Sequence, residues 1–213
     1  MNVAVCDYGA GNTRSVVAAF RRLGANPSVV RRPGDVLEAE LAVLPGVGAA
    51  ASAMRGLRET GLDQALRDRV DAGGPTLGIC LGLQLALDES EEDGGVPGLG
   101  LLPGRAVRLR AGRVPRMGWA RVEPEPAGDA RTGRSAAAGE PAAGGAGAAL
   151  LDGDFYFAHS FAAETSAAIA RSEGVVAAAR LGSFLGVQFH PEKSGAAGAR
   201  FLAQQLVQCL SRA

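Results

Sequence analysis

The chain has 213 residues, of which 47% are hydrophobic, and its 22 basic side chains balance 22 acidic ones. This length allows one domain with a sizeable core, and the absence of net charge argues against a nucleic-acid surface or a polybasic membrane contact. No apolar run approaches the roughly 20 residues of a membrane helix, and the N-terminus lacks a signal-peptide pattern. Three widely spaced cysteines make neither a disulfide framework nor a zinc site, so we expect the protein in the reducing cytoplasm. From its length we expect a single domain over residues 1–213.

Short apolar runs alternate with helical periodicity in the first third of the chain. Strands are predicted at Val3–Cys6, Ser28–Val30, Leu41–Leu44 and Thr76–Ile79, and helices at Thr13–Leu23 and Leu57–Val70. This alternation implies an α/β fold with a mostly parallel central sheet covered by helices. In such sheets the reacting groups collect at the carboxyl ends of the strands.

The composition changes after Gly104, and the C-terminal half predicts an antiparallel extension. Residues 125–147 are Ala, Gly, Pro, Ser and a few charges, which cannot bury a core, so we expect a low-complexity surface loop there. Strands are predicted at Arg105–Arg110 and in a short segment that ends at Val122–Pro124. Order is predicted to resume near Leu150, through Asp154–Phe161. An antiparallel pair of strands at Val175–Leu181 and Phe184–Phe189 and a helix at Gly198–Leu210 follow.

The most informative segment surrounds Cys80, where an apolar strand stops at a cysteine and a helical pattern starts at once. A tight strand-to-helix turn of this kind is typical of a nucleophile, and the flanking Gly78 and Gly82 let the backbone pass close to the thiol. The positive amide end of the following helix favours the thiolate. A lone cysteine is otherwise a small core residue, which is how we interpret Cys6 and Cys209.

A second segment, far downstream, carries one of only two histidines, His190, with a carboxylate two residues later at Glu192. Thiol, imidazole and carboxylate are the parts of a nucleophile, a base and a group that orients the base. A structural histidine with a chance acidic neighbour is the alternative.

Attack on an amide carbonyl also needs N–H donors for the oxyanion. The amide of Leu81 is one candidate, and the loop Gly46, Val47 and Gly48 can aim another. Gln84, one helical turn beyond Cys80, can face the same cleft and bind a polar end of the substrate. A simple turn and a solvent-facing glutamine are the alternatives for these two features.

Together these residues resemble the class I, triad-type glutamine amidotransferases. The matching segments are Pro45–Gly48, Gly78–Gln84 and Gln188–Glu192, in order and over nearly the whole chain. The resemblance implies a flavodoxin-like fold and hydrolysis of glutamine through a cysteine thioester. It assigns nucleophilic attack to Cys80, proton transfer to His190 and orientation of His190 to Glu192.

Further segments are similar to the glutaminase subunits of imidazole glycerol phosphate synthase, which act in histidine biosynthesis. These segments are Asp7–Val16, Met117–Trp119, Tyr156–Phe161 and His190–Ser194. The narrower resemblance implies a heterodimer with a separate (β/α)₈-barrel cyclase, which would use the ammonia to make imidazole glycerol phosphate and an aminoimidazole carboxamide ribotide. No metal or organic cofactor is called for, because no Cys/His cluster or phosphate loop occurs.

The same resemblance assigns residues outside the triad. His159, Ser160 and Phe161 match the segment that lines the glutamine pocket, and Val47 would carry an N–H that reorients when the acceptor binds. The positions that face the cyclase are Asn12, Trp119, Tyr156 and Lys193. Thr13, Arg116 and Ala120 depart from the usual pattern, which leaves the details of the subunit contact open.

Three other functions remain open at this point. One is a glutaminase that serves anthranilate, guanylate or pyridoxal phosphate synthesis, against which the Asp7–Val16 segment argues. Another is a stand-alone γ-glutamyl hydrolase that turns over without a partner. The third is a binding module without catalysis, which the complete set of Cys80, His190 and Glu192 disfavours.

Overall fold

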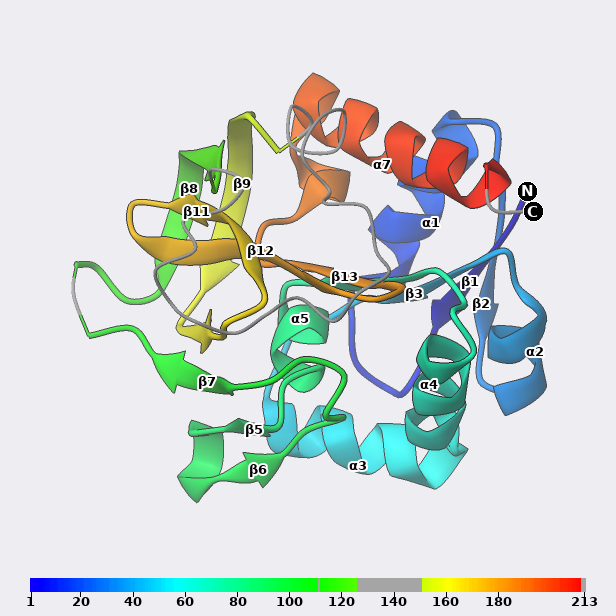
Figure 1. The fold of residues 1–213 in the computed structure, drawn as a ribbon, viewed down its shortest axis with the longest axis horizontal. Coiled ribbons are helices and arrows are strands. Elements are labelled where there is room, and N and C mark those ends of the chain that lie inside the picture. Colours follow the sequence, from blue (N-terminus) through cyan, green and yellow to red (C-terminus); the bar gives the residue numbers. More distant parts are fainter. Residues whose placement is uncertain (111, 126–150, 212–213) are drawn as a thin grey trace, which may run out of the picture.

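The protein is described by a computed structural model that covers residues 1–110, 112–125 and 151–211. Its centre is a nine-stranded mixed sheet (Figure 1). The parallel half contains, in spatial order, β2 (Asn26–Val30), β1 (Asn2–Cys6), β3 (Leu41–Leu44), β4 (Thr76–Ile79) and β13 (Phe184–Val187). The antiparallel half continues with β12 (Val175–Leu181), β11 (Ala168–Ser172), β8 (Arg116–Pro124) and β9 (Gly153–His159).

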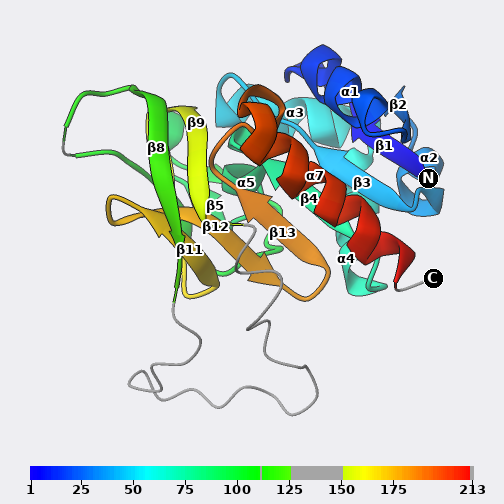
Figure 2. The same ribbon diagram turned by 90° about the horizontal axis from the view of Figure 1, so that it is seen from above.

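Helices cover both faces of the parallel half (Figure 1). On one face lie α1 (Thr13–Arg22) and α7 (Gly195–Leu210), and on the other lie α3 (Ala50–Thr60), α4 (Leu62–Asp71) and α5 (Leu81–Leu85). Seen from above, α7 runs across the central strands (Figure 2). Because side chains alternate along a strand, Val3 and Val5 pack with α1 and α7, whereas Ala4 and Cys6 pack with α3 and α4.

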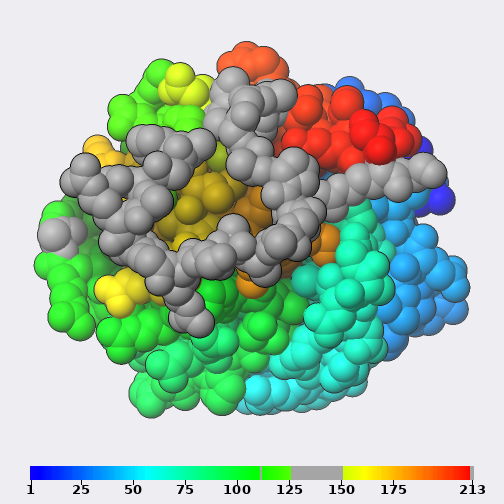
Figure 3. Space-filling view, viewed as in Figure 1, coloured from blue at the N-terminus to red at the C-terminus, as the bar shows by residue number. Residues whose placement is uncertain are grey.

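A smaller four-stranded sheet lies below the antiparallel half in Figure 1. Its strands are β10 (Phe161–Glu164), β7 (Arg105–Arg108), β5 (Glu89–Ser90) and β6 (Val96–Pro97), and η1 (Glu92–Gly94) is a short 3₁₀ turn between β5 and β6. The space-filling view shows the N-terminal third on one side of the molecule and the residues of the small sheet on the other (Figure 3). The active-site candidates lie between these two parts.

Most predicted elements are confirmed, and β3, β4 and β12 have the predicted bounds. The single helix predicted at Leu57–Val70 is wrong, because Gly61 takes a left-handed conformation with φ of +71° and separates α3 from α4. The ordered segment predicted through Asp154–Phe161 contains two strands, β9 and β10, which are separated at Ser160 and belong to different sheets. The short α2 (Pro33–Glu38) was not predicted.

The predicted surface loop begins at Glu125, which is paired with β11. Its N–H donates to the Ile169 carbonyl at 2.8 Å, and its carboxylate accepts a hydrogen bond from Arg171 at 2.6 Å. The rest of the predicted loop lies outside the described residues. Within the described residues, none of the helices has both the length and the apolar character needed to cross a bilayer.

Candidate active site

Cys80 stands on the tight turn between β4 and α5. Its backbone has φ of +53° and ψ of −105°, which is a strained conformation for a residue with a side chain. The turn is held because the Cys80 N–H donates to the Val187 carbonyl of β13 at 2.7 Å. The backbone of Gly82 packs against β3 so closely that a Cβ there would lie 2.0 Å from the Leu44 carbonyl oxygen. A glycine is therefore needed in the turn beside Cys80, as the sequence predicts.

The structure brings the three triad candidates together. His190 follows β13, and its Nδ1 lies 2.9 Å from Oε1 of Glu192 in the short 3₁₀ turn η2 (Pro191–Lys193). The side chain of Cys80 acts on the same ring and raises the pKa of His190. The side chains of His190 and Glu192 are only 2% and 1% exposed.

The charge of the His190 ring is set by its two partners. Burial lowers the pKa of His190, but the hydrogen bonds and negative charges of Cys80 and Glu192 outweigh it and raise the pKa to about 9. Oε2 of Glu192 has no hydrogen-bond partner within the described part of the chain, so His190 is the group that compensates this carboxylate. The ring therefore carries a proton at neutral pH. Its full charge outweighs the partial charge of α5, which has only five residues.

The loop after β3 packs directly on the nucleophile turn. A Cβ on Gly46 would lie 2.4 Å from Cβ of Leu81 and 2.6 Å from the amide nitrogen of Gly82, so only glycine allows this approach. The buried hydroxyl of Tyr8 donates a hydrogen bond to the Pro45 carbonyl and fixes the start of the loop. Val47 is 38% exposed and lies at the mouth of the cleft. This close packing places the loop of Val47 beside the turn that carries the Leu81 N–H.

A cavity of about 200 Å³ opens beside the sulfur of Cys80. Most of the predicted pocket residues line it, namely Val47, Gly48, Leu81, Gln84, His159, Ser160 and Phe161. Gly46 supports the wall from behind, without lining it. Three lining residues were not predicted, namely Glu92, Pro115 and Ala158. The acidic run Glu89–Asp93 after α5 was the available signal for Glu92.

Hydrogen bonds fix two polar side chains that line the cavity, those of Gln84 and His159. Gln84 donates both N–H groups of its side-chain amide, to the Phe161 carbonyl at 2.8 Å and to Oε1 of Gln188 at 3.1 Å. Its own carbonyl oxygen is therefore the atom left for a ligand. Burial lowers the pKa of His159 to about 4, so the ring is neutral, and its Nδ1 donates to the Phe161 carbonyl at 2.8 Å.

The residues expected to face a partner come from elements that pack on one another. Trp119 of β8 is 59% exposed and makes an edge-on contact with Tyr156 of β9 at 6.2 Å between ring centroids. Lys193 is exposed on η2, which packs against both α1 and β9, and Asn12 is the residue directly before α1. The Tyr156 carbonyl accepts a hydrogen bond from the His190 N–H at 2.8 Å. This surface is therefore joined to His190 by a single backbone hydrogen bond.

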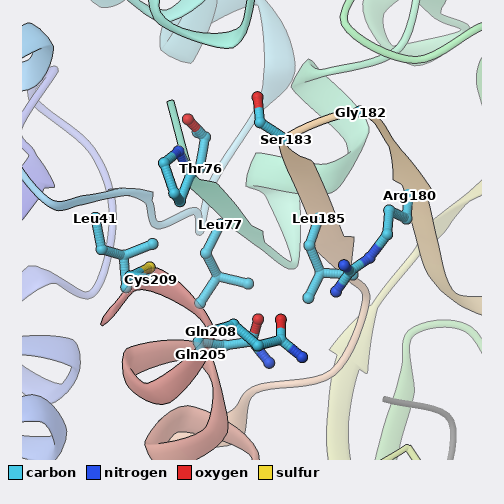
Figure 4. A pocket seen from close by; sticks show the side chains of 11 residues that line it. Leu41, Thr76, Leu77, Arg180, Gly182, Ser183, Leu185, Gln205, Gln208 and Cys209 are labelled. Atoms are coloured by element: carbon cyan, nitrogen blue, oxygen red, sulfur yellow. The ribbon is translucent and has the colours of Figure 1, made fainter. Parts of the chain in front are cut away.

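A second cavity lies at the opposite end of β4, where Gln205, Gln208 and Cys209 of α7 face Thr76 and Leu77 (Figure 4). Its volume is about 30 Å³, which is room for a single water molecule. The cavity beside Cys80 is therefore the better candidate for a substrate site.

The comparisons with known proteins agree on one family. The family model described as "Glutamine amidotransferase class-I" matches residues 4–209. The chain is similar to the "Imidazole glycerol phosphate synthase subunit HisH" of Carboxydothermus hydrogenoformans, with 42% identity over 93% of this chain and 95% of that protein. A protein of the same name from Thermus thermophilus is 40% identical over 95% of this chain and 96% of its own.

The chain is also similar to a longer relative and to several solved structures. "Imidazole glycerol phosphate synthase hisHF, chloroplastic" of Arabidopsis thaliana is 38% identical over 96% of this chain, which matches 34% of that protein. A crystal structure described as a glutamine amidotransferase superposes with a TM-score of 0.74 at 22% identity, over 97% of this chain and 98% of the other. PurLQS from Thermotoga maritima gives a TM-score of 0.68 at 19% identity, over 98% of each chain. These structural matches establish the α/β fold.

Proposed function

The chain belongs to the class I glutamine amidotransferases and, within them, to the glutaminase subunits of imidazole glycerol phosphate synthase, and from this membership we propose which of its residues do the chemistry. The activity is hydrolysis of glutamine for histidine biosynthesis. We assign nucleophilic attack to Cys80, proton transfer to His190 and orientation of the ring to Glu192. The observation that carries this assignment is that the His190 ring bonds to Glu192 through Nδ1 at 2.9 Å and that Cys80 raises the pKa of the same ring.

The first half of the reaction forms a thioester. The Cys80 sulfur attacks the side-chain carbonyl of glutamine, and the N–H groups of Leu81 and Val47 bind the oxyanion. The protonated ring of His190 then gives its proton to the amide nitrogen, so that ammonia leaves and a glutamyl thioester remains. The raised pKa of His190, about 9, supplies this proton at neutral pH.

The second half hydrolyses the thioester. Once the sulfur is acylated, its negative charge no longer supports the proton on His190, so the pKa of the ring falls and the neutral ring can take a proton from water. The resulting hydroxide attacks the carbonyl, glutamate leaves, and the thiolate and the protonated ring are restored. The net reaction converts glutamine and water to glutamate and ammonia.

The cavity suits a free amino acid. Glu92 carries the one charged side chain among the described residues that line it, since His159 is neutral. A carboxylate there can pair with the α-ammonium group of glutamine, while the carbonyl oxygen of Gln84 is free to accept a hydrogen bond from the substrate. We therefore add Glu92 to the substrate-binding residues Gln84, His159, Ser160 and Phe161.

We further propose that this subunit forms a cytoplasmic heterodimer with a (β/α)₈-barrel cyclase and delivers ammonia to it. The fusion named hisHF in Arabidopsis thaliana supports a close partnership, and the exposed Trp119 beside Tyr156 suits an interface anchor. Delivery through protein matters because free ammonia at neutral pH is mostly ammonium, which is not a nucleophile. None of the three cysteines forms a disulfide within the described residues, which suits a reducing cytoplasm.

The test is glutamine hydrolysis with and without the barrel cyclase and its ribonucleotide substrate. We expect stimulation of roughly a hundredfold or more, the value of one oxyanion donor brought into place. Equal rates with and without the partner would instead indicate a stand-alone hydrolase. Stimulation by the synthase subunit of another amidotransferase, in place of the cyclase, would reassign the pathway.

A further inference from the structure

A chain of side-chain amides ends on the sulfur of Cys80, and the catalytic steps above do not use it. Gln188 is completely buried, and its Nε2 lies 3.5 Å from Sγ of Cys80. We propose that Gln188 is a further catalytic residue, whose N–H holds the thiolate of Cys80, and that Gln84 is a positioning residue that fixes the Gln188 amide. This inference rests on the proposed role of Cys80 as the nucleophile.

Two groups near the sulfur, the Ala158 carbonyl and the Gln188 amide, favour different protonation states of Cys80. Sγ lies 3.8 Å from the Ala158 carbonyl, to which a thiol can donate its proton. A thiolate has no proton to give, so this carbonyl then repels it. Gln188 has the opposite preference, because an N–H donor gains strength when its acceptor becomes negative. Gln188 thus favours the reactive state of the sulfur.

The orientation of the Gln188 amide is fixed by its other neighbour. An amide could present either its N–H or its oxygen to the sulfur. Gln84 donates to Oε1 of Gln188 at 3.1 Å and to the Phe161 carbonyl at 2.8 Å, and both acceptors are carbonyl oxygens. Gln84 therefore cannot turn around without losing both bonds, and the oxygen of Gln188 stays away from the sulfur.

The backbone on each side of this amide chain is also fixed. The Gln188 N–H donates to the Ala177 carbonyl of β12 at 2.9 Å, and Gln84 lies on α5, directly behind the nucleophile turn. Neither glutamine can retreat from the sulfur without moving the sheet or the turn. The thiolate is consequently met by a donor that is already in place before glutamine binds, and again when the thioester is hydrolysed.

The experiment measures alkylation of Cys80 by iodoacetamide against pH in the full-length chain, with mass spectrometry to read the site. Iodoacetamide is small and neutral and reports the thiolate without needing the glutamine pocket. In Gln188→Met we expect the pH of half-maximal rate to rise by about one unit, and kcat for glutamine to fall about tenfold with KM within about twofold. Gln84→Met keeps Gln188 but frees its amide, so its shift should be smaller.

Gln205→Met is the matched control, because Gln205 is also buried and, among the described residues, its side chain donates to the Phe201 carbonyl of its own helix, at 3.4 Å. It should leave the midpoint of alkylation unchanged. A folded Gln188→Met protein with the wild-type midpoint would overturn the inference while leaving the nucleophile in place. If Cys80 of the wild type is not alkylated and Cys80→Ser still hydrolyses glutamine, the proposed function fails instead.

The wild-type chain provides a second test that does not depend on the stability of a variant. The side-chain amide protons of Gln188, followed by NMR, should shift with pH at the same midpoint as the alkylation of Cys80. In Cys80→Ala this titration should disappear. Amide resonances of Gln188 that do not change with pH in the wild type would contradict a hydrogen bond to the thiolate.

Discussion

The parallel and antiparallel halves of the nine-stranded sheet carry different groups at the cleft. In the parallel half, β3 and β4 end in the loop of Val47 and the turn of Cys80, and β13 leads into His190, so backbone turns and buried side chains meet there. In the antiparallel half, β8 and β9 carry the exposed ring of Trp119 and one wall of the cavity at His159. The proposed catalytic groups thus stand at the ends of parallel strands, and the candidate contact surface lies on the antiparallel extension.

Two cysteines within the parallel half sharpen this contrast. Cys6 ends β1 and Cys80 follows β4, so both stand at the carboxyl end of the same sheet. Burial raises the pKa of Cys6 to about 12, and its thiol stays protonated. Cys80 instead lies on a strained turn, accepts a hydrogen bond from Gln188 and interacts with the ring of His190. Position in the sheet is therefore not sufficient for reactivity, which depends on the groups that neighbouring elements supply.

The largest expected effect tests the difference between Cys80 and Cys6 directly. Cys80→Ala should lower stimulated glutamine hydrolysis by about 10⁴-fold or more, because the nucleophile is lost. Cys6→Ala, the same change at the end of β1, should alter kcat by less than about twofold. Steady-state assays on both variants, with circular dichroism to confirm folding, check the pair. Comparable losses in the two variants would contradict the distinction.

A second change tests the loop that follows β3. Val47→Pro removes the N–H assigned to the oxyanion and should lower stimulated hydrolysis by roughly a hundredfold or more. Val47→Ala keeps the N–H and should remain within about threefold of wild type. The comparison is made at saturating cyclase and nucleotide. Full stimulation in Val47→Pro would show that another donor does this work.

A third change tests the electrostatics of His190. The ring is protonated below about pH 9, so donation to the leaving ammonia should be lost as the pH rises through that value. Glu192→Gln removes a negative charge that raises this pKa, so the high-pH limb of kcat should move to lower pH and the rate should fall about thirtyfold at neutral pH. An unmoved limb would show that Glu192 does not set the charge of the ring.

The smallest expected effect lies in the antiparallel half. Trp119→Ala should weaken binding of the cyclase by about 2 kcal/mol, or roughly thirtyfold in Kd, as measured by isothermal titration calorimetry. Leu210→Ala, at an equally exposed apolar residue on α7, is the control and should bind normally. The rate at saturating cyclase should be restored in Trp119→Ala. An unchanged Kd would remove Trp119 from the interface.

The sequence predicts best the features that are local in the chain. β3 and β4 are short apolar runs bounded by turns, and the flanking Gly78 and Gly82 indicate the turn of Cys80. The helix α2 escapes prediction because it has six residues and only Val36 is buried, which leaves no periodicity to read. The break at Gly61 is hidden because α3 and α4 bury their apolar residues in one core.

The features that cannot be predicted are contacts between distant segments. Gln188 lies within a recognisable motif, yet its bond to Cys80 joins residues 108 positions apart, and its bond to Gln84 joins residues 104 apart. Glu92 enters the cavity because the small sheet folds beneath the cleft, and no local pattern encodes that arrangement. Long-range geometry therefore had to come from the structure.

The most direct test of the account is covalent labelling of the wild-type chain by an electrophilic glutamine analogue, read by peptide mass spectrometry. We expect one adduct, on Cys80, that glutamine competes away, with Cys6 and Cys209 unlabelled. An adduct on any other residue, or hydrolysis that continues while Cys80 is fully modified, would contradict the assignment of the nucleophile.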